Sequence, residues 1–149
     1  MSALDDAAFT GALAAAEALS KDPRRPRRPN RFLARSILLP LGEGLIEDPR
    51  GESTALERAL GVVGRDREGW QAAIDEDLTL AVTEHVRSCD PRALKLPAYD
   101  FPYTIAARHR LEARLRAASA LDLPASEALL AQVERADELL APFLERRER

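Results

Sequence analysis

The sequence predicts an all-α protein, a single-domain bundle of about six helices with two proline-containing irregular connections. Apolar residues recur at helical spacing along most of the 149 residues, and no segment shows the alternation of apolar and polar residues that is typical of a strand. A chain of this length forms one ordinary domain with a sizeable core. Residues 1–149 are therefore expected to fold as one helical domain.

The first two expected helices lie on either side of a proline-rich break. Alanine and leucine recur at helical spacing over about residues 3–20, where Ser2 and Asp5 resemble a capping box. Asn30 is the expected N-cap of the second helix, and Pro40 predicts a kink or a break within it. The core-facing positions of this helix are expected to be Phe32, Leu33, Ile37, Leu41 and Leu45. The stretch EDPRG at 47–51 ends it.

Two further helices are expected in the middle of the chain. Thr54 and Glu57 suggest a second capping box, and the short helix that they open ends at Gly64, a residue type favoured just past a helix C-terminus. Asp66 can cap the next helix, over about residues 67–88, which has a broad apolar stripe. That stripe consists of Trp70, Ile74, Leu78, Ala81, Val82 and Val86.

The last two helices are separated by a tight turn at Asp122 and Pro124. Thr104 is the expected cap of a helix that runs to about residue 121. Its inward side chains are expected to be Ile105, Leu111, Leu115 and Ala118. The final helix, over about 125–147, has a stripe of Leu129, Val133, Ala136, Leu140 and Phe143, widened by Leu130, Leu139 and Leu144. This stripe indicates either burial inside the bundle or packing against a partner helix.

A basic segment separates the first two helices. Residues 21–30 combine arginine with proline and are expected to form an extended linker. The basic side chains of interest are Arg24, Arg25, Arg27, Arg28 and Arg31. Residues 21–35 hold seven basic side chains and one acidic, net +6, in a chain whose net charge is −3. The remainder is therefore acidic, net −9, although residues 105–121 are net +3.

Three interpretations of this segment stay open. It is a solvated or internally paired linker, a docking site for an acidic protein, or an arm that contacts nucleic-acid phosphates together with Arg110 and Arg114. The acidic remainder opposes the last interpretation, and the chain has no zinc finger or aromatic RNA-binding motif. The nucleic-acid interpretation predicts that the arm and the helix over 105–121 share one face.

The second irregular connection, over residues 89–103, is expected to be a long aromatic loop. Tyr99, Phe101 and Tyr103 supply three of the seven aromatic residues in the chain. They are interpreted either as an apolar lid over the end of the bundle or as contacts for a ligand or partner.

No catalytic residue, metal site or cofactor is predicted. His85 and Cys89 are four residues apart on one helix, but Cys89 lies near the helix C-terminus, where the dipole disfavours a thiolate. His109 with Glu112, and Asp77 with Glu84, could meet as metal ligands. The chain nevertheless lacks the Glu-x-x-His motif of di-iron bundles.

Composition restricts the cellular setting. A single cysteine rules out an internal disulfide, Asp5 and Asp6 stand where a signal peptide would be basic, and no apolar run is long enough for a membrane span. A cytoplasmic location without membrane association is expected.

Three functional hypotheses follow. The main one is a non-catalytic protein–protein interaction module, an adaptor or assembly subunit that binds a protein partner or itself. The alternative is a small nucleic-acid-associated subunit that contacts phosphates through the arm and the arginine-rich helix. The third is an enzyme or ligand binder around the aromatic loop, with His85 or His109 facing a closed pocket.

Overall fold

Helices account for almost all of the structure, a computed structural model that describes residues 7–19, 28–49 and 54–148. The described residues contain seven helices and no strand, which confirms the all-α prediction. Six of them are long: α1 (Ala7–Leu19), α2 (Arg31–Glu47), α3 (Thr54–Arg65), α4 (Arg67–Ser88), α6 (Phe101–Ala120) and α7 (Glu127–Glu148). The seventh, α5 (Pro91–Leu94), is a single turn.

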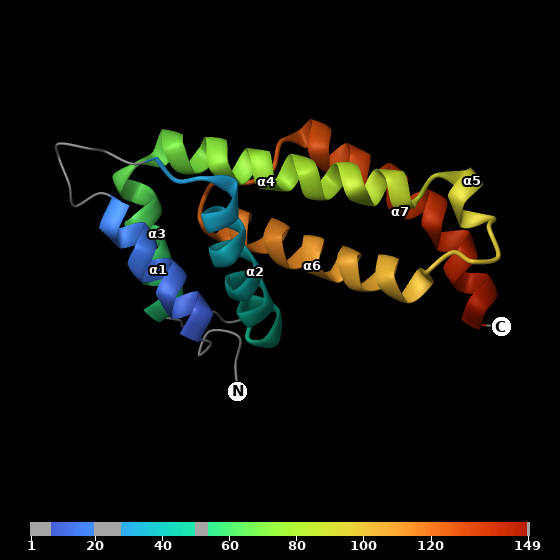
Figure 1. The fold of residues 1–149 in the computed structure, drawn as a ribbon, viewed down its shortest axis with the longest axis horizontal. Coiled ribbons are helices and arrows are strands. Elements are labelled where there is room, and N and C mark those ends of the chain that lie inside the picture. The colour runs from blue at the N-terminus through green and yellow to red at the C-terminus, as the bar shows by residue number, and fades with distance from the viewer. Residues whose placement is uncertain (1–6, 20–27, 50–53, 149) are drawn as a thin grey trace.

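The long helices form an elongated bundle with two different ends. Helices α4 and α6 run along the long axis with α7 beside them, and α1, α2 and α3 gather at one end (Figure 1). Helix α2 crosses this end and packs against both α4 and α6. The short α5 and the end of α7 form the opposite end. Three helices, α2, α4 and α6, therefore meet at one place along the bundle.

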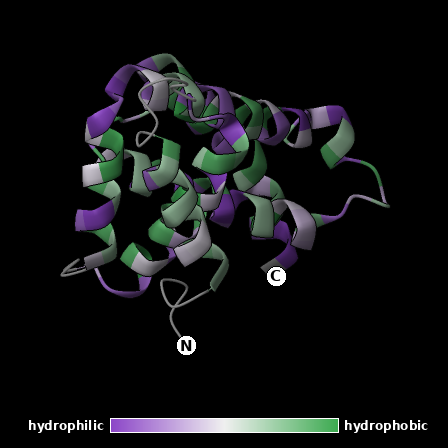
Figure 2. Cartoon of the chain, turned by 60° about the vertical axis from the view of Figure 1, so that its left-hand side comes forward, coloured by the Kyte–Doolittle hydropathy of each residue, from purple (hydrophilic) through white to green (hydrophobic). Residues whose placement is uncertain are grey.

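Among the described residues, the hydrophobic core has one large part and two small parts, one of which joins Val82, Leu111 and Val133 of α4, α6 and α7. The large part lies among α1, α2, α3, α4 and α6 and is centred on side chains such as Leu38, Leu41 and Leu78, which are almost completely buried. The other small part joins Cys89 and Leu94 to α7 at the opposite end. Figure 2 shows that hydrophobic and hydrophilic residues alternate around these helices, as amphipathic packing requires.

Helices α2 and α6 approach so closely that one contact excludes every side chain except hydrogen. Gly42 of α2 is buried against the backbone of α6. A Cβ atom at this position would lie only 1.7 Å from the carbonyl oxygen of Ala113. Glycine at 42 therefore sets the distance between the two helices.

The expected caps are correct at two helices, and α2 ends at the EDPRG stretch as expected, but neither Pro40 nor Gly64 marks a helix end. Asn30 accepts a hydrogen bond from Leu33 N at 2.9 Å, and Asp66 accepts one from Gly69 N at 3.0 Å. Pro40 does not end α2, which continues to Glu47. Gly64 lies inside α3 and is not its C′ residue, because the helix extends to Arg65.

The connection over 89–103 is shorter than expected, because two of its three prolines begin helices. Pro91 follows the N-cap Asp90 of α5, and Pro102 lies in the first turn of α6. Proline is tolerated there because the first amides of a helix have no intrahelical acceptor. The cap of α6 is Asp100, whose carboxylate accepts from Tyr103 N at 3.0 Å, and not Thr104.

Several side chains that were expected in the core are exposed. The largest is Phe32, which is 62% exposed and has the Arg31 guanidinium 4.4 Å above its ring centroid. Val86 and Ile105 are also exposed. Leu130 and Leu139 of α7, for which the sequence left burial and packing against a partner helix open, are exposed as well. The periodicity identified the correct helices but overestimated the width of their buried faces.

The turn after α6 is a Schellman motif. The amide of Leu123 donates to Ala118 O and the amide of Asp122 donates to Ser119 O. Asp122 has a φ of 60° in the left-handed region. The tight turn that Asp122 and Pro124 predicted is therefore present.

Candidate functional site

A groove of about 560 Å³ lies between α4 and α6, with the N-terminal turns of α2 closing one side. Side chains from all three helices line it, since residues 77–88, 103–114 and 31–35 contribute. Tyr103 and Leu80 stand at its exposed edge, and Tyr103 is 59% exposed. The volume is suitable for a small molecule or for one group of a larger ligand.

Arginine dominates the charge of this groove. The five guanidinium groups belong to Arg31, Arg35, Arg87, Arg110 and Arg114. The two carboxylates are those of Asp77 and Glu84, so the lining is net +3 in a chain whose net charge is −3. The groove is therefore a positive site on an acidic protein, and it attracts anions.

Two oppositely charged side chains in the wall of the groove attract each other without forming a hydrogen bond. Arg114 Nη1 is 3.7 Å from Asp77 Oδ1, a distance at which the charges attract but no hydrogen bond forms. The two side chains are only 9% and 8% exposed. Within the described residues, Arg114 Nε and Asp77 Oδ2 are buried without a hydrogen-bond partner.

Burial disfavours the charged form of both Asp77 and Arg114. Burial raises the pKa of Asp77, although Arg114, Arg35 and Arg31 act in the opposite direction. Burial also lowers the pKa of Arg114, and the charges of Arg35 and Arg110 lower it further. One carboxylate therefore faces several guanidinium groups that repel one another. An additional anion would relieve this excess of positive charge.

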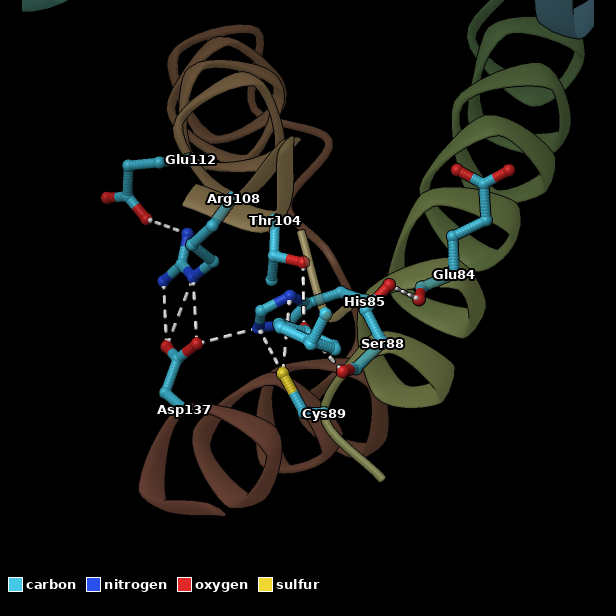
Figure 3. A network of polar contacts seen from close by, with 9 residues as sticks. Glu84, His85, Ser88, Cys89, Thr104, Arg108, Glu112 and Asp137 are labelled. Carbon is cyan, nitrogen blue, oxygen red and sulfur yellow. Dashed lines mark hydrogen bonds and ion pairs between the residues drawn. The ribbon is translucent and has the colours of Figure 1, made fainter. Parts of the chain in front are cut away.

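On the other side of the groove, the buried side chain of His85 contacts α7. The His85 ring lines the groove, and its Nε2 atom lies 2.7 Å from Asp137 Oδ1 of α7. Arg108 of α6 binds the same carboxylate through two nitrogens, with Nε to Oδ1 and Nη2 to Oδ2 both at 3.0 Å (Figure 3). Arg108 also donates to Glu112 at 3.0 Å. One carboxylate thus fixes three helices relative to one another.

The hydrogen bonds of this network favour the ionised forms of two carboxylates, Asp137 and Glu112. Burial alone would raise the pKa of Asp137, but hydrogen bonds from Arg108 and His85 outweigh it and lower the pKa. Burial would also raise the pKa of Glu112, and hydrogen bonds from Arg108 and Arg116 lower it instead. The carboxylates of Asp137 and Glu112 are therefore ionised and well paired, in contrast to the pair at Asp77 and Arg114.

The side chains of Cys89, His85 and Asp137 are arranged in the order of a nucleophile, a base and a carboxylate in a catalytic triad. Their geometry nevertheless does not suit catalysis. The sulfur of Cys89 is 3.8 Å from His85 Nδ1 and 3.9 Å from Nε2, so it is almost equidistant from both ring nitrogens (Figure 3). A base would need one nitrogen directed at the sulfur. Cys89 is 0% exposed, and burial together with the Asp137 charge raises its thiol pKa to about 11. The thiol is protonated at neutral pH and has no access to a substrate.

The groove brings together some of the residues that the sequence identified. Arg31, Arg110, Arg114 and Tyr103 line it. Arg28 is exposed and does not belong to the lining. Arg24, Arg25 and Arg27 lie outside the described residues.

The three aromatic residues of 99–103 are divided between two environments. Tyr99 and Phe101 form an edge-to-face pair with ring centroids 4.5 Å apart and pack against the small core cluster around Cys89. The Tyr99 hydroxyl donates to Ser88 O at 2.6 Å and is 2.8 Å from Thr104 Oγ1. Only Tyr103 lines the groove. Two of the three therefore close the end of the bundle.

Three residues of the groove were not predicted to share a site with these arginines: Asp77, Arg35 and Arg87. A signal was present for Asp77, because it interrupts the apolar stripe of α4 between Ile74 and Leu78. Arg114 interrupts the stripe of α6 in the same way. A charged residue at a core-facing position of each of two helices predicts a buried pair when those helices are neighbours.

Comparisons with protein-family models, with curated proteins and with solved structures gave no match. Among the described residues, no three His, Cys, Asp or Glu side chains are grouped so that they could hold a metal ion. No helix within the described ranges is both long and apolar enough to cross a membrane.

Proposed function

We propose that this chain is a binding protein that holds a phosphate-bearing ligand in the groove between α4 and α6. The observation that carries the proposal is the convergence of five arginines on one groove, while the chain as a whole is acidic. Guanidinium groups bind phosphate oxygens through paired, charge-assisted hydrogen bonds.

The groove shields one of these charges from water, because Arg114 is buried within its wall, whereas Arg35 and Arg87 are exposed. Arg35 and Arg110 are close enough to Arg114 to lower its pKa. An anion placed among them interacts with several guanidinium groups at reduced dielectric screening. Tyr103 and Leu80 at the edge add apolar surface for the part of the ligand that is not phosphate.

The nucleic-acid alternative stays a prediction beside this proposal, whose ligand is a small phosphate-bearing molecule, although both draw on the same arginines. The basic segment 21–35 and the helix over 105–121 both contribute arginines to the groove, through Arg31 and Arg35 on one side and Arg110 and Arg114 on the other. The adaptor or assembly hypothesis stays a prediction. The same holds for self-association.

The test is calorimetric titration of the purified protein with inorganic pyrophosphate, beside anisotropy of a labelled single-stranded oligonucleotide, at low and at physiological salt. Arg110→Gln and Arg35→Gln should each weaken binding about tenfold, because each removes one charge-assisted contact. Arg116→Gln is the matched control: it removes the same charge from α6, but Arg116 pairs with Glu112 outside the groove.

Binding of both probes would favour a nucleic-acid ligand, and binding of pyrophosphate alone would favour a small phosphorylated molecule. The proposal fails if neither probe binds at low salt. It also fails if Arg116→Gln weakens binding as much as Arg110→Gln, because the attraction would then be a property of the net charge.

A further inference from the structure

Two side chains that line the groove each contain one polar atom that has no hydrogen-bond partner within the described part of the chain. Asp77 Oδ2 is an acceptor when the carboxylate is ionised, and Arg114 Nε carries a hydrogen that it can donate. Both atoms are buried without a partner among the described residues. They belong to neighbouring side chains, since Arg114 Nη1 and Asp77 Oδ1 are 3.7 Å apart.

Leaving such atoms unpaired is costly, and native proteins rarely do so without a reason. The other polar network around the groove is fully connected, since Asp137 receives hydrogen bonds from both Arg108 and His85. The unpaired atoms are therefore confined to the part of the lining where the arginines converge. A group that fits there must donate to Asp77 and accept from Arg114.

From this we propose that the groove selects a phosphate group that carries a proton, as inorganic phosphate or a phosphate monoester does, over a phosphodiester or sulfate. The inference rests on the proposed function and narrows its ligand class. The P–OH group of the ligand donates to Asp77 Oδ2, and an anionic oxygen of the same phosphate accepts from Arg114 Nε. No bond to phosphorus forms or breaks.

The selectivity follows from the protons that each anion has to offer. Inorganic phosphate retains a P–OH group at neutral pH, and a monoester has its second pKa at about 6, so its protonated form is accessible. Sulfate and a phosphodiester are fully ionised and have no hydrogen for Asp77. In their presence the carboxylate would be left unpaired beside a second negative charge, an arrangement that is disfavoured in a buried site.

Glu84 provides a matched control in the same groove. Its carboxylate also lines the groove, but Glu84 is exposed and is not one of the groups that lack a partner. Removing its charge should strengthen the binding of phosphate and of sulfate to a similar extent. Asp77→Asn also removes a charge, but it introduces an amide that can donate to an anion without a proton.

The experiment measures the dissociation constants of inorganic phosphate, ribose 5-phosphate, dimethyl phosphate and sulfate by two-dimensional NMR titration at neutral pH and constant ionic strength. The wild-type protein should bind phosphate and ribose 5-phosphate at least about tenfold more tightly than dimethyl phosphate and sulfate. Glu84→Gln should preserve this ratio, and Asp77→Asn should bring it close to one, mainly through tighter binding of sulfate.

Each outcome distinguishes the inference from the proposed function. Wild-type protein that binds phosphate and sulfate equally well overturns the inference and leaves the phosphate-binding function standing. An Asp77→Asn protein that keeps the preference for phosphate also overturns it. Failure of the wild-type protein to bind any of the four anions, or pyrophosphate, removes both. Because the wild-type ratio is decisive by itself, the inference remains falsifiable even if Asp77→Asn does not fold.

Discussion

His85 Nε2 and Asp137 Oδ1 are 2.7 Å apart although the two residues are separated by 52 positions in the chain. The contact joins α4 to α7 directly behind the arginine-lined groove, and Arg108 of α6 binds the same carboxylate. Asp137 is therefore the residue through which the structure holds three helices in register around the candidate site.

Asp137→Asn should lower the free energy of unfolding by about 1–2 kcal/mol, because it weakens charge-assisted hydrogen bonds from a partly exposed position. Urea denaturation followed by circular dichroism measures the change. The control is Glu138→Gln, which alters an exposed carboxylate on the same helix and should change stability by less than about 0.5 kcal/mol. Equal effects of the two substitutions would contradict the structural role of Asp137.

The lowered pKa of Asp137 predicts that the stability of the protein depends on pH. The pKa of Asp137 is lower in the folded protein than in the unfolded chain, so its contribution is complete above the unfolded value of about 4. The contribution is lost as the pH falls through the folded value. The difference in stability between the wild type and Asp137→Asn should therefore shrink on acidification below about pH 5. A difference that grows on acidification would refute the assignment.

Gly42→Ala should be strongly destabilising, by about 2–4 kcal/mol, because its methyl group would collide with the backbone of Ala113 and force α2 away from α6. Thermal and urea denaturation measure this. Gly61→Ala provides the opposite control, since a Cβ there meets nothing within 4 Å and the residue is exposed within α3. That substitution should stabilise the protein by about 0.5–1 kcal/mol through helix propensity. The predicted helix contact is wrong if both substitutions have the same sign.

Cys89 should be unreactive towards thiol reagents in the native protein near neutral pH. Its side chain is completely buried and its thiol pKa is raised to about 11, so neither access nor thiolate is available. The rate of labelling by a disulfide reagent should follow the population of unfolded protein as urea is added. Rapid labelling without denaturant would show that Cys89 is accessible and would reopen a catalytic role.

Replacing Asp77 and Arg114 with apolar residues should weaken ligand binding without a comparable loss of stability. Arg114→Met alone should cost about 2–4 kcal/mol, because it leaves the Asp77 carboxylate buried beside an apolar side chain. The double substitution Asp77→Leu with Arg114→Met should recover most of this loss, since apolar residues replace poorly paired charges without an unmet hydrogen-bonding need.

Urea denaturation of Arg114→Met and of the double variant measures these changes in stability, and calorimetry with pyrophosphate follows binding in the same proteins. The double variant should be nearly as stable as the wild type and should bind pyrophosphate more weakly. A double variant that is less stable than Arg114→Met would show that the pair is retained for stability.

Local chemistry determined most of the secondary structure. Asn30 and Asp66 cap helices because a side-chain oxygen can reach an amide three residues later, and this needs no tertiary contact. The same local reasoning failed for Pro91 and Pro102, which were interpreted as part of a loop. Proline is compatible with both a loop and a first helical turn, and Asp90 and Asp100 decide in favour of the latter.

The sequence by itself determined the helical periodicity, the acidic balance and the two arginine-rich segments from which Arg31, Arg110 and Arg114 come. Only the tertiary structure decided that these arginines share a groove with Asp77, that Phe32 is exposed, and that His85 meets Asp137. Periodicity specifies which face of a helix is apolar, but not which neighbour covers it. That choice depends on contacts between distant segments, such as Gly42 against Ala113, which no local pattern encodes.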